Sequence, residues 1–230
     1  MTPTQAPPSR LALFDLDHTL LPLDSDYRWA DFLARAGHVG DPAAACARNE
    51  ELMRRYDEGK LTAMESAEFM LGLLARNTPY DLARWHEDFM AEVIRPAISA
   101  QAIALVREHL EAGDLCAIAT STNTFVTAPI ARAFGIPVLL ATEPEYVAGR
   151  YTGRIQGIPC FREGKVVRVN QWLAGHGWQL SDFRQSFFYS DSMNDVPLLE
   201  AVTDPVAANP SAALRELARE RGWRITDLFA

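Results

Sequence analysis

Two aspartates that follow an apolar run are the first residues in this sequence that could do chemistry. Asp15 and Asp17 stand at the end of Leu11–Asp15, which has the composition of a buried strand. Alternate residues of a strand share a face, so both carboxylates would project from its carboxyl end. Two carboxylates this close repel each other and call for a divalent cation or a shared proton. The pair therefore predicts either a metal site or an acid beside a nucleophile.

A second acidic pair follows another apolar run. Asp191 and Asp195 come after Ser186–Ser190 and are four residues apart. Side chains at this spacing meet if a helix begins at this point. In a parallel α/β sheet the carboxyl ends of the strands lie at one edge, where ligands bind. We therefore expect the two acidic pairs to lie at the same edge of one sheet.

Hydroxyl and amide side chains follow a third apolar run. Leu115–Thr120 leads into Ser121–Asn123, just before a helix that the spacing of apolar residues predicts over Phe125–Phe134. Free N–H groups at a helix start suit an anion such as phosphate. Capping of the helix by Thr122 or Asn123 is the more conventional interpretation of those two residues.

A lysine further along the chain is the next candidate. Lys165 follows Gly164 at the start of a helix predicted to run through Trp172. The pair is not a phosphate-binding P-loop, because the upstream glycine and the following Ser or Thr are missing. Taken alone, a lysine is usually a solvated surface residue.

The alternation of apolar runs with helical patterns predicts how these residues are positioned. Strands are expected over Leu11–Asp15, Leu115–Thr120, Val138–Thr142, Phe187–Ser190 and Pro205–Ala207. Such alternation is typical of an α/β fold with a doubly wound, Rossmann-like parallel sheet. Residues 146–161, with glycines at 149, 153 and 157, predict a hairpin or excursion, and a last helix is expected from Asn209 to about Arg221.

The long segment between the first two expected strands has a different pattern. Four helices are predicted there, over Tyr27–Ala36, Ala43–Glu58, Ala63–Leu74 and Tyr80–Val93. We therefore expect a core built from residues 1–23 and 96–230, with residues 24–95 as an inserted helical unit.

Composition narrows the function classes. The 230 residues include 22 basic and 30 acidic side chains, a net charge of −8, and no basic run, which argues against nucleic-acid binding. The first ten residues lack the apolar region of a signal peptide, and no stretch approaches the roughly 18 apolar residues of a membrane span. Cys46, Cys116 and Cys160 lack metal-binding spacing and are expected to be free thiols in a reducing cytoplasm. The oligomeric state is left open.

The motifs, in their order, resemble those of the haloacid dehalogenase-like superfamily of aspartate-nucleophile phosphotransferases. More narrowly, they are similar to the subfamily that contains phosphoserine phosphatase. The resemblance rests on Phe14–Leu21, Thr120, Gly149–Arg154, Gly164-Lys165, Tyr189–Asp195 and Val206–Pro210. Ser190 stands where a glycine is commoner, and Thr120 where a serine is commoner. The resemblance implies that the helical insertion is a cap of the C1 type, which closes over the active site.

The resemblance also implies roles for the acidic residues. Asp15 would be the nucleophile that attacks phosphorus and forms an aspartyl-phosphate. Asp17 would protonate the leaving alkoxide and then act as the base that activates water. The carboxylates of Asp15 and Asp191 and the backbone carbonyl of Asp17 would hold Mg²⁺.

Further roles follow for the other motif residues. Thr120 and adjacent N–H groups would bind the phosphoryl oxygens, and Ser121 could take this part because the alignment is ambiguous by one residue. Lys165 would offset charge on the phosphoryl group and on Asp15. Asp195, outside the metal's own ligands, would orient Lys165 or a water on the metal.

The substrate prediction depends on two acidic residues of the cap. In the subfamily, a glutamate nine residues beyond the nucleophile meets the amine of phosphoserine; that spacing falls on Asp24 here. The cap arginine that holds the substrate carboxylate falls on Glu68. A carboxylate facing a carboxylate is repulsive, so a cationic substrate without a carboxylate is favoured. L-histidinol phosphate, a phosphate ester of histidine biosynthesis, fits this description.

A narrower resemblance supports that substrate. The segments Asp24–Asp26, Asn123–Thr127 and Gly153–Lys165 resemble bacterial members of the subfamily assigned as histidinol-phosphate phosphatases. Ser121 and Asn123 would also lie near the substrate, and Trp29, Phe69 or Trp85 would either stack on its imidazole or form the core of the cap. Asp24 or Asp26 could instead simply cap the next helix. The alternatives are a phosphoserine phosphatase, a non-hydrolytic phosphotransferase and a ligand-binding module on the same fold.

Overall fold

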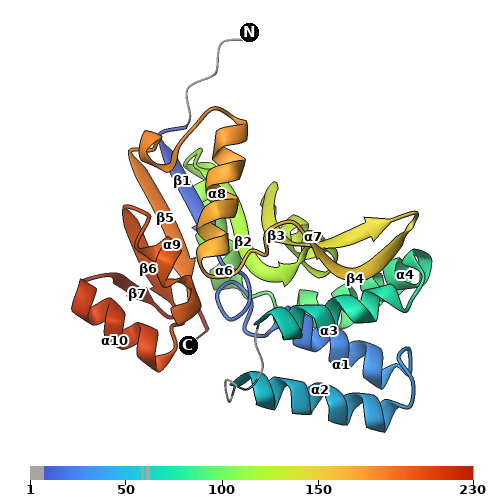
Figure 1. Cartoon of the computed structure of the whole chain (residues 1–230). Helices are drawn as coiled ribbons and strands as arrows, with labels where there is room; N and C mark the ends of the chain where they lie inside the picture. Colours follow the sequence, from blue (N-terminus) through green and yellow to red (C-terminus); the bar gives the residue numbers. More distant parts are fainter. Residues whose placement is uncertain (1–7, 58–59, 61–62, 230) are drawn as a thin grey trace.

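A seven-stranded sheet forms the centre of the computed structural model, which describes residues 8–57, 60 and 63–229. The strands lie in the order β4-β3-β2-β1-β5-β6-β7 (Figure 1). They are β1 (Arg10–Phe14), β2 (Leu115–Asn123), β3 (Val138–Val147), β4 (Arg150–Gln156), β5 (Gln185–Ser190), β6 (Asp204–Ala208) and β7 (Arg224–Thr226). All neighbours are parallel except β3 and β4. Because the chain crosses from β1 to both sides, the sheet is doubly wound, and the predicted α/β class is confirmed.

Helices cover both faces of this sheet. Those of the core are α6 (Ala100–Glu111), α7 (Thr124–Phe134), α8 (Glu163–Gly175), the short α9 (Val196–Leu199) and α10 (Ala212–Arg221). Apolar side chains alternate between the two faces along each strand. Leu13 and Phe188 face α8, α9 and α10, whereas Phe14 and Tyr189 face α6 and α7. This packing fixes the carboxyl ends of β1 and β5 beside each other.

The segment between β1 and β2 is helical in its described part, as predicted. It contains α1 (Ser25–Arg35), α2 (Pro42–Asp57), α3 (Ala63–Ala75), α4 (Pro79–Phe89), a π-helical turn (Met90–Ile94) and the short α5 (Arg95–Ala97). Residues 58–59 and 61–62, where the sequence predicts a break between two helices, lie outside the described residues. We refer to residues 24–95 as the helical insertion.

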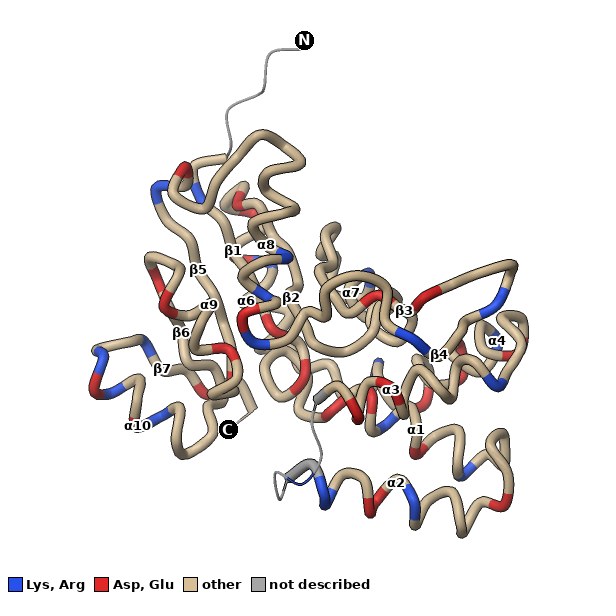
Figure 2. Tube along the Cα trace, in the orientation of Figure 1, with Lys and Arg blue, Asp and Glu red and all other residues tan. Residues whose placement is uncertain are grey.

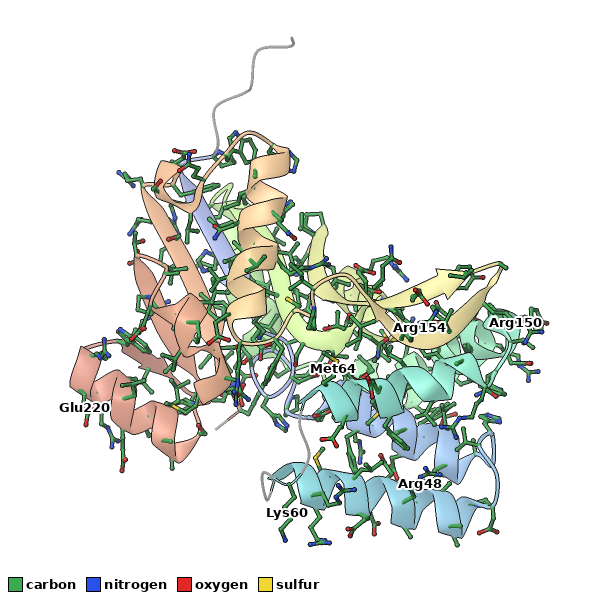
Figure 3. All side chains as sticks on the ribbon, in the orientation of Figure 1. Arg48, Lys60, Met64, Arg150, Arg154 and Glu220 are labelled. Carbon is green, nitrogen blue, oxygen red and sulfur yellow. The ribbon has the colours of Figure 1, made fainter. Side chains whose placement is uncertain are left out.

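Side-chain contacts between helices hold the insertion together. The guanidinium of Arg48, which Figure 3 labels on α2, lies 5.6 Å from the ring centre of Phe69 on α3, which places a cation over an aromatic face. Asn49 of α2 donates a hydrogen bond of 3.2 Å to the backbone carbonyl of Tyr27 in α1. Acidic and basic residues are interspersed along α2 and along α10 (Figure 2), so neither helix presents a purely basic face.

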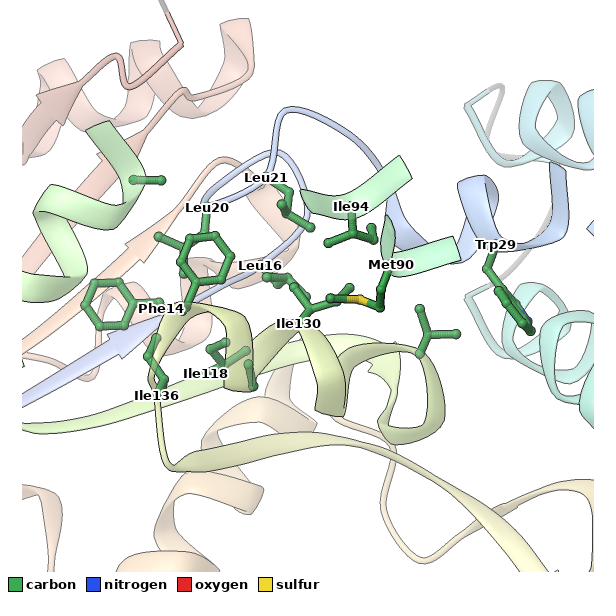
Figure 4. Packing of buried hydrophobic residues seen from close by; sticks show 14 of the residues in the cluster. Phe14, Leu16, Leu20, Leu21, Trp29, Met90, Ile94, Ile118, Ile130 and Ile136 are labelled. Carbon is green, nitrogen blue, oxygen red and sulfur yellow. The ribbon is translucent and has the colours of Figure 1, made fainter. Parts of the chain in front are cut away.

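One apolar cluster runs without a break from the sheet into the helical insertion. Figure 4 shows Phe14 of β1 and Leu16 and Leu20 of the following turn packed near Met90 and Ile94 of the π-helical turn. The same cluster continues to Trp29, Leu33, Leu71 and Phe89 of the insertion. The burial of these side chains anchors the insertion next to the end of β1.

The predicted hairpin is present, but its first strand begins earlier than expected. β3 extends from Val138 to Val147 and turns through Ala148 and Gly149, both with positive φ (49° and 81°), into antiparallel β4. β4 lies against α3 of the insertion. A side chain at Gly153 would come within 3.4 Å of Ala75, so this glycine allows the close approach.

Two other details differ from the sequence expectation. β2 continues to Asn123, three residues beyond the predicted end, because polar residues carry on the ladder there. A short seventh strand, β7, follows Gly222, where the preceding helix ends as predicted. No single described helix combines the length and the apolar composition needed to cross a bilayer; only the bent pair Pro79–Ala97 and Ala100–Glu111 does so when counted together.

Candidate active site

The turn that follows β1 separates the two aspartates of the first motif. The backbone N–H of Asp15 donates to the carbonyl of Tyr189 at 2.9 Å, which continues the β1–β5 ladder. The carbonyl of Leu16 then accepts from three N–H groups of residues 19–21. His18 takes a left-handed conformation, with a φ of 58°, and Asn209 donates to the carbonyls of His18 and Thr19 at 3.1 and 3.0 Å. The turn is therefore held from the end of β6.

Thr19 stands between the carboxylates of Asp15 and Asp191. Its hydroxyl lies 3.3 Å from Asp15 Oδ2 and 3.3 Å from Asp191 Oδ1, and it accepts the N–H of Asp191 at 3.1 Å. Both acidic pairs thus meet at the carboxyl ends of neighbouring strands, as the sequence predicts. Sequence reasoning placed Thr19 in the first motif but gave it no role.

Lys165 joins the two acidic pairs. Its Nζ donates to Asp15 Oδ1 at 2.8 Å and to Asp195 Oδ2 at 2.7 Å, and all three side chains are buried. Asp195 Oδ2 also accepts the hydroxyl of Ser190 at 2.7 Å. The serine found where a glycine is commoner therefore helps to fix Asp195, which in turn fixes the lysine.

Negative charge exceeds positive charge in this buried cluster. Burial, and then the charge of Asp195 against the opposing charge of Lys165, raises the pKa of Asp15 to about 7. Burial and the charge of Asp15 raise the pKa of Asp191 to about 8. Burial alone would lower the pKa of Lys165, but Asp15 and Asp195 outweigh it and raise that pKa. Lys165 therefore stays charged beside Asp15 and Asp195. Because the cluster also contains Asp191, it lacks positive charge, which a cation would supply.

The donor set at this point fits Mg²⁺. Within the described residues, no three His, Cys, Asp or Glu side chains converge as ligands of one ion. Mg²⁺ does not require that number, because it usually keeps several waters and binds one or two carboxylates together with substrate phosphate. Asp15 and Asp191, which face each other across Thr19, supply two carboxylates. Burial and neighbouring carboxylates raise the pKa of both groups, and a cation at this point would favour their ionised forms.

The side chain of Asp17 has a different environment. Its Oδ2 accepts the hydroxyl of Thr122 at 2.7 Å, and its Oδ1 accepts the N–H of Ser25 at 2.9 Å. Burial, and then the charge of Asp24, raises the pKa of Asp17 to about 6. Each oxygen of this carboxylate thus already accepts one hydrogen bond, and binding of a metal by the backbone carbonyl of Asp17 stays a prediction.

The polar end of β2 supplies the remaining predicted residues. Thr120 is buried and its hydroxyl accepts the N–H of Thr122 at 3.3 Å, so its own proton stays available for an anion. Ser121 is exposed, whereas Thr120 and Thr122 on either side of it are buried. Asn123 caps α7 by accepting the N–H of Val126 at 3.1 Å. The capping interpretation is confirmed for Asn123, whereas Thr122 binds Asp17 instead.

The acidic residues of the insertion are placed differently from one another. Asp24 caps α1 by accepting the N–H of Tyr27 at 2.7 Å, which confirms the capping interpretation, and its charge still acts on Asp17. Asp26 accepts a hydrogen bond from Asn123 at 2.8 Å; burial and the charges of Asp24 and Asp17 raise its pKa. Glu68 is exposed on α3, and a role in substrate binding stays a prediction.

Aromatic residues of the insertion form its core. Trp29 is fully buried, with its ring centre 5.3 Å from that of Phe89 and 5.6 Å from that of Phe125. Trp85 stacks on His38 with ring centres 3.9 Å apart. For Trp29 and Trp85 the structure agrees with the core interpretation.

A nucleophile-type carboxylate beside a buried lysine, with a second aspartate two residues on, matches one known family. The model of the haloacid dehalogenase-like hydrolases matches residues 12–200, which include both acidic pairs, Thr120 and Lys165. The chain belongs to this family. It is also 44% identical over 216 residues to a histidinol-phosphatase of Neisseria meningitidis serogroup C, an alignment that covers 94% of this chain and 97% of the relative.

Solved structures of family members have the same fold. A Bordetella pertussis protein described as having unknown function is 70% identical and superposes with a TM-score of 0.94, over 96% of this chain and 99% of its own. A substrate-bound phosphoserine phosphatase, 17% identical, superposes with a TM-score of 0.67, over 96% and 93% of the two chains. At that identity the likeness shows the fold alone.

Proposed function

We propose that this haloacid dehalogenase-like hydrolase is a Mg²⁺-dependent phosphomonoesterase that acts through an aspartyl-phosphate on Asp15. The observation that carries the proposal is the separation of two neighbouring aspartates into two environments. Asp15 contacts Lys165, whereas Asp17 is held by Thr122 and Ser25. Carboxylates whose surroundings differ in this way can serve as nucleophile and as acid–base group in the same reaction.

The first half-reaction follows from this placement. Lys165 donates to Asp15 and favours the ionised form of this carboxylate, which is the form that attacks phosphorus. A new Asp15–phosphorus bond forms as the bond from phosphorus to the alkoxide breaks. Asp17 gives its proton to that alkoxide.

The second half-reaction uses Asp17 in reverse. Asp17 takes a proton from a water molecule as the water attacks phosphorus, and the Asp15–phosphorus bond breaks to release phosphate. A group that both gives and takes a proton works best when its pKa is near the working pH. The pKa of about 6 meets that condition.

The other residues stabilise charge. Lys165, the hydroxyl of Thr120 and the N–H groups at the end of β2 would bind phosphoryl oxygens. When bound, Mg²⁺ would be held by the carboxylates of Asp15 and Asp191 and the backbone carbonyl of Asp17, and would offset the charge of the phosphoryl group. Asp195 orients Lys165. The helical insertion would act as the cap that excludes water.

The substrate we propose is L-histidinol phosphate, which places the enzyme in histidine biosynthesis. The near full-length relative named a histidinol-phosphatase supports this substrate. The acidic surroundings of Asp17, to which Asp24 contributes, favour a cationic molecule without a carboxylate. Phosphoserine, which carries a carboxylate, is the alternative. The free thiols of Cys46, Cys116 and Cys160 agree with a cytoplasmic location.

The test compares phosphate release from L-histidinol phosphate and L-phosphoserine at equal concentration with Mg²⁺. We expect at least a tenfold preference for histidinol phosphate and no release by Asp15→Asn. Asp41→Asn is the matched control, because Asp41 is an exposed helix cap and asparagine caps equally well. A preference for phosphoserine would refute the substrate. Activity that persists in Asp15→Asn would refute the nucleophile, and binding without turnover would indicate a ligand-binding module.

A further inference from the structure

The carboxylate of Asp26 lies at the junction of the helical insertion and the core, next to Asp17. Two consecutive residues at the end of β2 hold the two acids: Thr122 donates to Asp17 at 2.7 Å, and Asn123 donates to Asp26 at 2.8 Å. Asn123 is itself fixed, because its side-chain oxygen Oδ1 caps α7 by accepting the N–H of Val126. Asp26 is therefore held at a defined distance along β2 from the group that protonates the leaving alkoxide.

Asp26, which is partly buried, has no cation beside it, in contrast to the buried aspartates. Among the described residues, Asp31 pairs with Arg35, and Asp114 pairs with Arg10. Asp15 and Asp195 share Lys165. No lysine, arginine or histidine in the described part of the chain pairs with Asp26. Its hydrogen-bond donor is the neutral amide of Asn123. An acid in this setting is stabilised by a cation from outside the chain.

The neighbouring polar residue is engaged with Asp17 rather than with Asp26. The hydroxyl of Ser25, the residue between Asp24 and Asp26, is buried, and both this hydroxyl and the N–H of Ser25 act on the carboxylate of Asp17 and lower its pKa. Asp26 therefore keeps the amide of Asn123 as its donor and receives none from Ser25.

The direction of the reaction decides which part of the substrate meets Asp26. Phosphorus must lie at Asp15, and the leaving oxygen must lie at Asp17, which gives it a proton. The carbon skeleton beyond that oxygen would therefore lie near Asp17, whose charge acts on Asp26. The charge of Asp24 also acts on Asp17, but one oxygen of Asp24 is engaged in capping α1.

We propose that Asp26, positioned by Asn123, binds the cationic nitrogen group of the phosphate ester and is the residue that selects a cationic substrate. The proposal rests on the proposed function, because it assumes that Asp15 and Asp17 act on a phosphate ester. The ligand class is a phosphorylated metabolite with a protonated amine or imidazole near the ester oxygen. Asn123 is a positioning residue, and Asp26 makes the contact.

The experiment measures selectivity and binding separately. The selectivity is the ratio of kcat/KM for L-histidinol phosphate to kcat/KM for p-nitrophenyl phosphate, whose leaving group has no cation. We expect Asp26→Asn to lower this ratio at least tenfold, mainly through KM. Asn123→Ser keeps a residue that caps α7 but removes the amide donor, and should lower the ratio by a smaller factor. Asp31→Asn, the same change on the same helix away from the site, should leave the ratio unchanged.

Binding of L-histidinol, the product without phosphate, is measured by calorimetry and does not depend on turnover. We expect Asp26→Asn to weaken it at least tenfold. An unchanged ratio together with unchanged histidinol binding would overturn the role of Asp26 while leaving the phosphatase intact. Failure of the wild type to bind histidinol would also overturn it. Failure of the wild type to release phosphate from either ester would instead refute the proposed function.

Discussion

Gly164 offers a way to disturb Lys165 without changing its chemistry. A methyl group at Gly164 would overlap the carbonyl oxygen of Pro159 and lie 3.4 Å from its carbonyl carbon. Carbon and carbonyl oxygen normally stay about 3.3 Å or more apart, so the start of α8 would have to move by roughly 1 Å. Lys165 is the next residue, and its bonds of 2.8 and 2.7 Å to Asp15 and Asp195 would not survive such a shift.

The expected effects of Gly164→Ala follow from these distances. Overpacking against backbone costs about 1–3 kcal/mol of unfolding free energy, and each kcal/mol lowers Tm by about 2–4 °C in a chain of this size. A displacement of about 1 Å at a catalytic group costs on the order of 100-fold in rate. We therefore expect a folded protein with a modestly lower Tm and a kcat about two orders of magnitude below that of the wild type.

Gly175→Ala is the matched control for this prediction. Gly175 belongs to the same helix, and a methyl group there would meet nothing within 4 Å. The control should keep full activity and gain a few tenths of a kcal/mol, because alanine is the better helix former. Phosphate release and thermal melts are measured on both variants. A Gly164→Ala protein with activity within threefold of the wild type would refute the reasoning, since Lys165 would then not depend on the close approach at Pro159.

Three further predictions concern the same site. Ser190→Gly removes the hydroxyl that binds Asp195 and should lower kcat about fivefold, in line with a hydrogen bond of about 1 kcal/mol, as phosphate-release kinetics would show. Asp15 and Asp191 have pKa values raised to about 7 and 8, so between pH 5 and 8 the folded state holds more protons than the unfolded state. The metal-free protein should therefore lose stability as pH rises, by roughly 1.4 kcal/mol for each unit of net shift, and added Mg²⁺ should raise Tm more at pH 8 than at pH 5. Arg162 has a φ of 50° and a ψ of −123°, so Arg162→Gly should relieve backbone strain and raise the unfolding free energy by about 1 kcal/mol in denaturant titrations.

The sequence predicts the parts of the site that local patterns encode. Buried strands are recognisable as apolar runs, and the rule that ligands bind at the carboxyl ends of parallel strands brings Asp15 and Asp191 together without any coordinates. The helix start at Asn123 follows from a capping residue, which acts within three positions of itself. These features depend only on nearby residues or on one general rule of topology.

The missed features depend on contacts between distant segments. Thr122 binds Asp17, a residue 105 positions away, and its local pattern suits a helix cap equally well. The contact of β4 with α3 depends on how the insertion rests on the sheet, which the spacing of apolar residues does not encode. The proposed role of Glu68 comes from counting residues along the insertion, yet a helix places successive residues on different faces, and this one is exposed.

The contacts of Asp17 show how the insertion and the core share the proposed catalytic acid. The core supplies Thr122 as a donor, while the insertion supplies the N–H of Ser25 and the charge of Asp24. The donors lower the pKa of Asp17, while burial and the charge of Asp24 raise it, so the value near 6 depends on the position of α1. Removal of α1 from the core would take away one donor and the neighbouring charge at once. The protonation of Asp17 is thus linked to the position of the helix that also carries Asp26, so the proposed substrate contact and the proposed acid catalysis depend on the same element.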